Sequence, residues 1–202
     1  MRSIKKIDGL LGPWSDRGIA SDFKGPSGHK FLNRDKEIRI SWSRLHQYAK
    51  DILLSEKTMR VLDVGCGSGA TLEVFRYYGH KAVGLDYSTG KSWDNDWIYS
   101  PMIKSQGLSC RLHNGSDLPY PFKENEFDLV ICWSAITFFK PVKKWPHILD
   151  EFARLSKSAI IVAPNAGQVY DRGRPLIEAW KPPGGFRLTE SHAGRYRWDK
   201  RG

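Results

Sequence analysis

The sequence predicts an α/β fold in which a mostly parallel β-sheet carries helices on both faces. Short apolar runs alternate with longer segments of helical periodicity, which is typical of parallel strands joined by right-handed helical crossovers. Two of these runs, residues 129–132 and 160–162, are apolar throughout, as expected of strands covered on both faces. A further strand, residues 60–64, leads through a glycine-rich turn into a helix.

The expected elements follow one another in a regular order. Glycine and proline interrupt any periodicity in residues 1–33, which we expect to form an irregular arm. Residues 34–55 carry apolar side chains at three- and four-residue spacing, and this spacing predicts a helix. Strands are predicted at residues 60–64, 81–86, 109–112, 127–132 and 159–163, with helices between them at residues 69–78, about 92–106 and 146–155.

The segment after residue 165 is basic and rich in proline and glycine. It predicts a short helix at residues 176–180 and a small hairpin formed by residues 186–189 and 195–198. Because only 37 residues follow Asn165, we expect the C-terminal part of the sheet to be shortened. The predicted organisation is a single domain over residues 1–202, made of an N-terminal arm (1–33), an N-terminal helix (34–55), a core (60–165) and a basic tail (166–202).

The net charge of +10 is unevenly distributed. Residues 1–60 hold 13 Lys or Arg against 7 Asp or Glu, residues 61–165 hold 11 against 11, and residues 166–202 hold 8 against 4. Both flanks of a neutral core are therefore basic. Such flanks can attract an anionic substrate, such as a phosphorylated molecule or RNA, or they can form an ordinary solvated surface.

The three cysteines, Cys66, Cys110 and Cys132, show no C-x-x-C spacing, and each lies in or beside a predicted strand. This pattern favours small apolar core residues in a reducing compartment, and no metal site is expected. No apolar run is long enough to span a membrane, and charged residues interrupt the N-terminal segment where a secretory signal would lie. We therefore expect a cytoplasmic protein.

The most informative segment is Val61–Gly69, where an aliphatic strand ends in Asp63 and glycines follow at positions 65, 67 and 69. Glycine adopts positive φ at no steric cost and lets the backbone approach a ligand closely. Asp63 can accept a hydrogen bond from a ligand's ammonium group. Asp86, at the end of the next strand, can accept from both hydroxyls of a ribose.

These features occur together with two others in a fixed order. Val83–Ser88 ends the second strand, Asn114–Pro119 follows the third, and Phe127–Cys132 forms the fourth. With the Val61–Gly69 segment, they resemble the motifs of class I S-adenosylmethionine-dependent methyltransferases, which have a Rossmann-like fold. The resemblance covers residues 35–165 and implies S-adenosylmethionine as cofactor. It places the cofactor site at Asp63, Gly65, Cys66, Gly67, Gly69, Asp86, Tyr87, Ser88, Asn114, Gly115, Ser116, Asp117, Cys132 and Trp133.

A dinucleotide site is the main alternative, because Gly65–Ala70 also satisfies the G-x-G-x-x-G/A pattern and Asp86 follows about 20 residues later. Asp63 would, however, sit poorly beside a pyrophosphate, and the loop carries no Arg or Lys to balance one. The Asn114–Pro119 and Phe127–Cys132 segments also have no role in that interpretation.

We therefore expect a methyltransferase whose acceptor is a small molecule or glycan precursor, with RNA less favoured. The alternative is a protein that binds adenosylmethionine without catalysing a reaction. The substrate mouth is expected to be aromatic, and residues 34–55 to act as a lid or as an ordinary packing helix. No catalytic residue is assigned, and the oligomeric state is not predicted. The aromatic candidates are Trp133, Phe138 and Trp42, and the candidate bases are His29, His46, His113 and His192.

Overall fold

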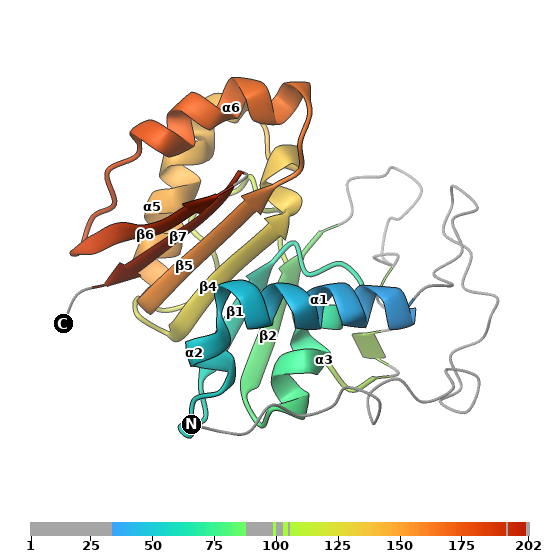
Figure 1. Ribbon diagram of the computed structural model, residues 1–202. Coiled ribbons are helices and arrows are strands. Elements are labelled where there is room, and N and C mark those ends of the chain that lie inside the picture. The colour runs from blue at the N-terminus through green and yellow to red at the C-terminus, as the bar shows by residue number, and fades with distance from the viewer. Residues whose placement is uncertain (1–33, 88–98, 100–102, 105, 193, 201–202) are drawn as a thin grey trace.

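The computed structural model describes residues 34–87, 99, 103–104, 106–192 and 194–200. Seven strands form one sheet in the order β3-β2-β1-β4-β5-β7-β6 (Figure 1). The first five of these are parallel neighbours, and β7 runs antiparallel to both β5 and β6. The strands are β1 (Arg60–Val64), β2 (Lys81–Asp86), β3 (Ser109–Leu112), β4 (Phe127–Ser134), β5 (Ser156–Pro164), β6 (Phe186–His192) and β7 (Arg195–Lys200).

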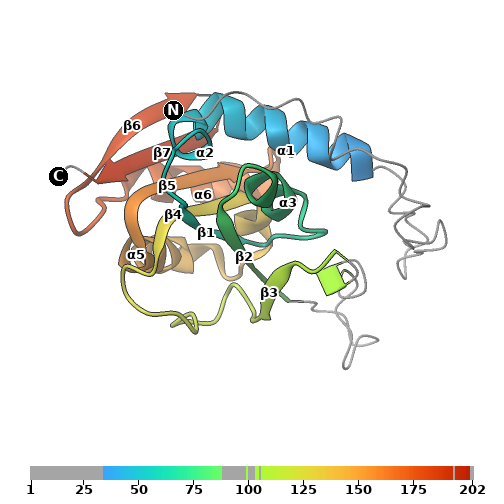
Figure 2. The ribbon, with the colours of Figure 1, turned by 90° about the horizontal axis from the view of Figure 1, so that it is seen from below.

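Helices cover both faces of the sheet (Figures 1 and 2). Alternate residues of β4 show why: Leu129 and Ile131 pack with α1 and α3, whereas Val130 and Cys132 pack with α5 and α6. A strand covered on both faces must be apolar throughout. The helices are α1 (Arg34–Tyr48), α2 (Lys50–Leu53), α3 (Ala70–Tyr77), α5 (Trp145–Leu155) and α6 (Gln168–Ala179), with short 3₁₀ turns η3 (Ala135–Phe138) and η4 (Val142–Lys144).

The predicted Rossmann-like class is confirmed, but the expectation of a shortened C-terminal part of the sheet is wrong. The tail after residue 165 supplies α6 and then both remaining strands, so the sheet has seven strands. The predicted hairpin exists and is longer than expected. It completes the sheet because β7 pairs directly with β5, for example Val162 with Tyr196.

Helix α6 is also longer than the predicted helix at residues 176–180. Gly173 and Pro175 lower helix propensity within it. Packing overrides this preference, since Tyr170 and Ile177 are buried and Gly173 lies against the ring of Trp145, where a Cβ would overlap. Most of the helix predicted at about residues 92–106 lies outside the described residues, as does the whole N-terminal arm.

Within the described part of the chain, no helix is long and apolar enough to cross a membrane. The same residues contain no cluster of three or more side chains suited to hold a metal ion.

Candidate functional site

The glycine-rich loop lies where β1 meets α3, at the carboxyl ends of the parallel strands. Gly65 N–H donates to the carbonyl of Leu85 on β2 over 2.6 Å, which holds the loop against the neighbouring strand. Gly65 has φ +76°, and a Cβ there would overlap the Cβ of Ala135. Gly69 has φ +79° and is the residue before α3. A residue other than glycine would be strained by the positive φ at both positions, and at position 65 its Cβ would also overlap Ala135.

Asp86 is the last residue of β2, and its carboxylate binds the glycine-rich loop. Its Oδ2 accepts from Gly67 N–H and its Oδ1 from Tyr87 N–H, each over 2.7 Å. Burial raises the pKa of Asp86, while these two backbone donors counteract the rise. A carboxylate oxygen has two lone pairs, so each oxygen can still accept a further donor from a ligand. Ser88 lies outside the described residues.

A pocket of about 270 Å³ opens between this loop and α1. Two of its lining residues carry a buried polar atom that has no hydrogen-bond partner: Asp63 Oδ1, on a residue 2% exposed, and Trp133 Nε1, on a residue 7% exposed. Buried unpartnered polar atoms are rare, because each costs desolvation free energy. The lining residues are Glu37, Ile40, Ser41, Arg44, Asp63, Gly65, Cys66, Gly67, Ser68, Ala70, Thr71, Tyr99 and Trp133.

Asp63 is in an unusual electrostatic environment. Burial, and after it the nearby charge of Asp86, raise the pKa of Asp63 to about 7, against the weaker opposing effects of Thr71 and Arg44. The carboxyl group is thus poised to ionise near neutral pH. Arg44 lies close by, with its guanidinium carbon 5.8 Å from the centre of the Trp133 ring.

Four lining residues come from α1, and sequence reasoning missed all of them: Glu37, Ile40, Ser41 and Arg44. Helix α1 is anchored on α3 and its preceding loop, since Ser68 donates from its hydroxyl to Glu37 and Ser41 accepts from Thr71 over 3.4 Å. The helical periodicity of residues 34–55 indicates which side packs on the sheet. It does not reveal which polar residues border a ligand pocket.

The segment after β3 lies next to Asp86 and does not line the pocket. His113 N–H donates to the carbonyl of Asp86 over 3.0 Å. Asn114 Oδ1 accepts from Ser116 N–H over 3.0 Å in a local turn, and Ser116 Oγ accepts from Lys140 N–H over 3.0 Å. Gly115 is buried against Phe139, and Asp117 is exposed at the end of the turn.

The cysteines behave as core residues. Burial raises the pKa of Cys132 and of Cys66, so both remain thiols at neutral pH. Cys132 lies within β4 behind the pocket, and Cys66 Sγ lies 3.7 Å from Cys110 Sγ. No nucleophilic role follows from these surroundings.

Among the described residues, no histidine lines this pocket. His46 bonds to the hydroxyl of Tyr78 over 3.1 Å between α1 and α3, His113 bonds to the carbonyl of Asp117 over 2.7 Å, and His192 is exposed on β6. His29 lies outside the described residues.

Of the predicted aromatic mouth, only Trp133 lines the pocket. Phe138 is 74% exposed on η3. Trp42 does not line it; its indole N–H donates to Tyr78 over 3.1 Å on the side of α1 that packs on α3.

Comparison with known proteins decides the family. Residues 34–202 match the methyltransferase domain family, which takes its methyl group from S-adenosylmethionine. The chain belongs to this family. It is 33% identical over 99 residues to the 18S rRNA (guanine-N(7))-methyltransferase bud23 of Schizosaccharomyces pombe, covering 49% of this chain and 35% of that protein.

Two further relatives show similar partial coverage. The uncharacterized methyltransferase YcgJ of Bacillus subtilis is 30% identical over 99 residues, covering 48% of this chain and 36% of its own. The small RNA 2′-O-methyltransferase of Mus musculus is 24% identical over 151 residues, covering 68% and 38%. The chain spans little more than a third of the length of these relatives.

Solved structures share the fold. The magnesium protoporphyrin IX methyltransferase ChlM of Synechocystis PCC 6803, solved with bound S-adenosylmethionine, aligns with a TM-score of 0.54 over 100% of both chains at 14% identity. An S-adenosylmethionine-dependent methyltransferase from Archaeoglobus fulgidus aligns with a TM-score of 0.54 over 78% of this chain and 74% of its own, at 17% identity.

Proposed function

We propose that this chain binds S-adenosylmethionine in the pocket between the glycine-rich loop and α1 and transfers its methyl group to an acceptor there. The observation that carries the proposal is the pair of unpartnered buried atoms, Asp63 Oδ1 and Trp133 Nε1. The cofactor's amino-acid end has an ammonium group, which needs an acceptor, and a carboxylate, which needs donors. Asp63 supplies the acceptor, and Trp133 with the cationic Arg44 supplies the donors.

The remaining contacts follow from the loop and from the strand ends. Gly65, Cys66, Gly67 and Gly69 are assigned to a close backbone cradle, and Asp86 with Tyr87 to the ribose. Ser88, which the resemblance also assigns to the ribose, lies outside the described residues. The turn after β3 extends this side of the site toward the adenine, because His113 N–H links it to Asp86. We assign that contact to Asn114, Gly115, Ser116 and Asp117, and we place Cys132 behind the pocket as a core residue.

When bound, the cofactor supplies an electrophilic methyl group, which an acceptor's lone pair attacks in line with the departing thioether. The chain's own residues act mainly by orientation. Asp63 and Arg44 fix the amino-acid end, Asp86 fixes the ribose, and the apolar surface of Ile40 and Trp133 limits access of water. No general base is assigned among the described residues.

The proposal also concerns the chemical class of the methyl acceptor. The resemblance favours a small molecule or glycan precursor, with RNA as the alternative. The relatives' names include both kinds, since bud23 and the murine enzyme are named for RNA and ChlM for magnesium protoporphyrin IX. Family membership therefore does not choose between them.

Methyl transfer is tested with S-adenosylmethionine carrying a tritiated methyl group. The purified chain is incubated with total RNA and, separately, with a small-molecule extract, and tritium is measured in each. Transfer that is lost in Asp86→Ala supports the proposal. S-adenosylhomocysteine binding without transfer to any pool would instead support a non-catalytic adenosylmethionine-binding protein.

A Trp133→Phe variant tests the site itself, because it removes the indole N–H together with the five-membered ring and keeps one aromatic ring. S-adenosylhomocysteine should bind more weakly to this variant. 5′-Methylthioadenosine, which lacks the amino-acid end, should bind as well as it does to the wild type. Equal weakening of both ligands would contradict the assignment of Trp133 to the carboxylate.

A further inference from the structure

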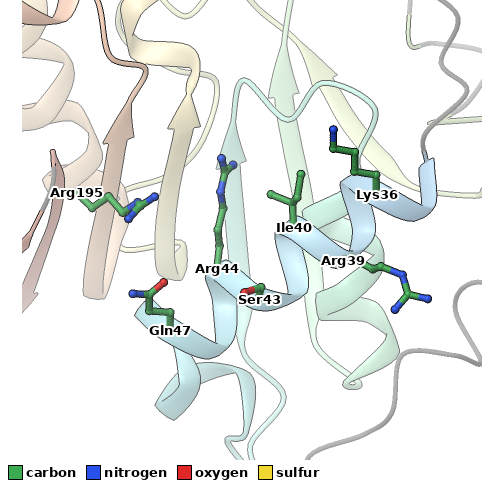
Figure 3. A pocket seen from close by; sticks show the side chains of 7 residues that line it. All are labelled: Lys36, Arg39, Ile40, Ser43, Arg44, Gln47 and Arg195. Atoms are coloured by element: carbon green, nitrogen blue, oxygen red, sulfur yellow. The ribbon is translucent and has the colours of Figure 1, made fainter.

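We infer that the acceptor is an RNA strand whose phosphates dock in a cationic groove on the outer side of α1. This inference rests on the proposed function, because it names the substrate class of the same site. The groove has a volume of about 570 Å³, and Figure 3 shows the side chains that line it. Its lining residues are Lys36, Arg39, Ile40, Ser43, Arg44, Gln47 and Arg195.

Four of these seven residues are cationic, and none is acidic. Among the described residues, no carboxylate forms an ion pair with any of the four. Arg195 instead donates to the hydroxyl of Tyr48 over 2.8 Å, with its guanidinium 5.3 Å from the centre of that ring. Elsewhere the chain does pair its arginines, as Arg197 with Asp51 and Arg154 with Glu151 show. Lys36, Arg39 and Arg195 therefore carry positive charge that no described ion pair offsets, whereas Arg44 also interacts with the nearby charge of Asp63.

The topology brings Arg195 to this place. Strand β7 runs antiparallel to β5 and begins at Arg195, so its first residue lies at the edge of the sheet where the parallel strands end. Arg195 extends from β7 toward α1, while Lys36, Ile40 and Arg44 extend from α1 toward the strand ends (Figure 3). The proximity of Arg195 and burial both lower the pKa of Arg44, burial being the larger effect. Two cations held near each other favour binding of an anion.

The groove borders the proposed cofactor pocket, because Ile40 and Arg44 line both. A molecule bound along α1 thus reaches the methyl donor without leaving the protein surface. The groove can hold the part of an acceptor that does not react.

The spacing of the charges suits a chain of phosphates. Lys36 and Arg44 lie eight residues apart on one helix, about 12 Å at 1.5 Å per residue. Cations distributed over this length of helix, with Arg195 beside them, can contact successive phosphates of a strand. Neutral polar side chains, Ser43 and Gln47, lie between or beside the cations. The cations can contact the phosphates of RNA and the neutral polar groups its ribose hydroxyls, which an acidic peptide lacks.

The test measures binding of a fluorescein-labelled oligouridylate of about 12 nucleotides by fluorescence anisotropy. The groove variant is Lys36→Glu with Arg39→Glu. The matched control is Lys143→Glu with Lys144→Glu on η4, two exposed residues whose replacement changes the net charge equally. Sodium tripolyphosphate and polyglutamate serve as competitors, and each protein is also titrated with S-adenosylhomocysteine to verify its fold.

We expect the groove variant to bind oligouridylate at least about tenfold more weakly at 0.1 M salt, with a salt slope smaller by about 1.4, and the control to remain within about twofold of wild type. Equal effects of both variants would show attraction by net charge only and would overturn the proposal. Displacement by polyglutamate as strong as by RNA would indicate an acidic protein acceptor, and selective displacement by tripolyphosphate a phosphorylated small molecule; either would also overturn it.

The two proposals fail separately. S-adenosylhomocysteine binding without oligouridylate binding would overturn the RNA groove and leave the methyltransferase proposal standing. Oligouridylate binding that depends on the groove, without S-adenosylhomocysteine binding, would support the groove and contradict the cofactor assignment.

Discussion

Asp63 makes binding of the cofactor's ammonium group dependent on pH. In the ligand-free protein its pKa is about 7, because burial and the nearby Asp86 disfavour the carboxylate. A bound ammonium group favours the carboxylate, so the pKa falls in the complex. Below pH 7, binding of the ammonium group requires Asp63 to lose a proton. The affinity for the ligand therefore rises with pH until the carboxyl group is ionised.

The magnitude follows from the fraction of Asp63 that is ionised. With a pKa of about 7, roughly one tenth of the protein carries the carboxylate at pH 6 and about nine tenths at pH 8. The affinity for S-adenosylhomocysteine should then increase about tenfold from pH 6 to pH 8. About half a proton should be released per ligand bound at pH 7.

Isothermal titration calorimetry in buffers of different ionisation enthalpy measures both quantities. 5′-Methylthioadenosine is the matched control ligand, because it keeps the ribose and adenine and lacks the ammonium group. Any contribution from Asp86 affects both ligands, so the ratio of the two affinities isolates Asp63. In Asp63→Asn this ratio should no longer change with pH. A ratio independent of pH in the wild type would refute the reasoning.

The other predictions concern the ribose contact, the loop and the anchoring of α1 and α2. Asp86→Ala should weaken both S-adenosylhomocysteine and 5′-methylthioadenosine by at least about tenfold in calorimetry, since it removes a charge-assisted contact worth about 1.5–3 kcal/mol. Gly65→Ala should lower the free energy of unfolding in urea by about 3 kcal/mol, because it combines positive φ with overlap at Ala135. Arg197→Ala should lower the free energy of unfolding by about 2 kcal/mol. Arg197 donates to both carboxylate oxygens of Asp51 over 2.7 and 2.8 Å and to the carbonyl of Tyr48 over 2.8 Å. A change within experimental error would show that these bonds do not stabilise the fold.

The central strands β1, β4 and β5 were predictable because burial on both faces restricts their composition. The predicted strand at residues 60–64 coincides with β1, and the one at residues 81–86 coincides with β2. Strand β4 extends two residues further than predicted, to Ser134, where the backbone turns with φ +64° into η3. Such a positive φ at a residue other than glycine is set by the surrounding structure, and no sequence pattern indicates it.

The pocket was predictable only where the motif itself forms it. Asp63, Gly65, Gly67 and Trp133 meet in the pocket as the strand order requires, because β1 and β4 are neighbours in the sheet. Arg44 could not be predicted, since its contribution depends on how α1 packs on α3. The same uncertainty explains Trp42, which shares the apolar stripe of α1 with Ile38 and Leu45 and therefore packs inward.

The central claim is that the pocket binds S-adenosylmethionine and not a dinucleotide. Calorimetric titration of the purified chain with S-adenosylhomocysteine, with NAD in parallel, tests it most directly. The account predicts micromolar binding of S-adenosylhomocysteine, its loss in Asp86→Ala, and no binding of NAD. Binding of NAD without binding of S-adenosylhomocysteine would contradict it.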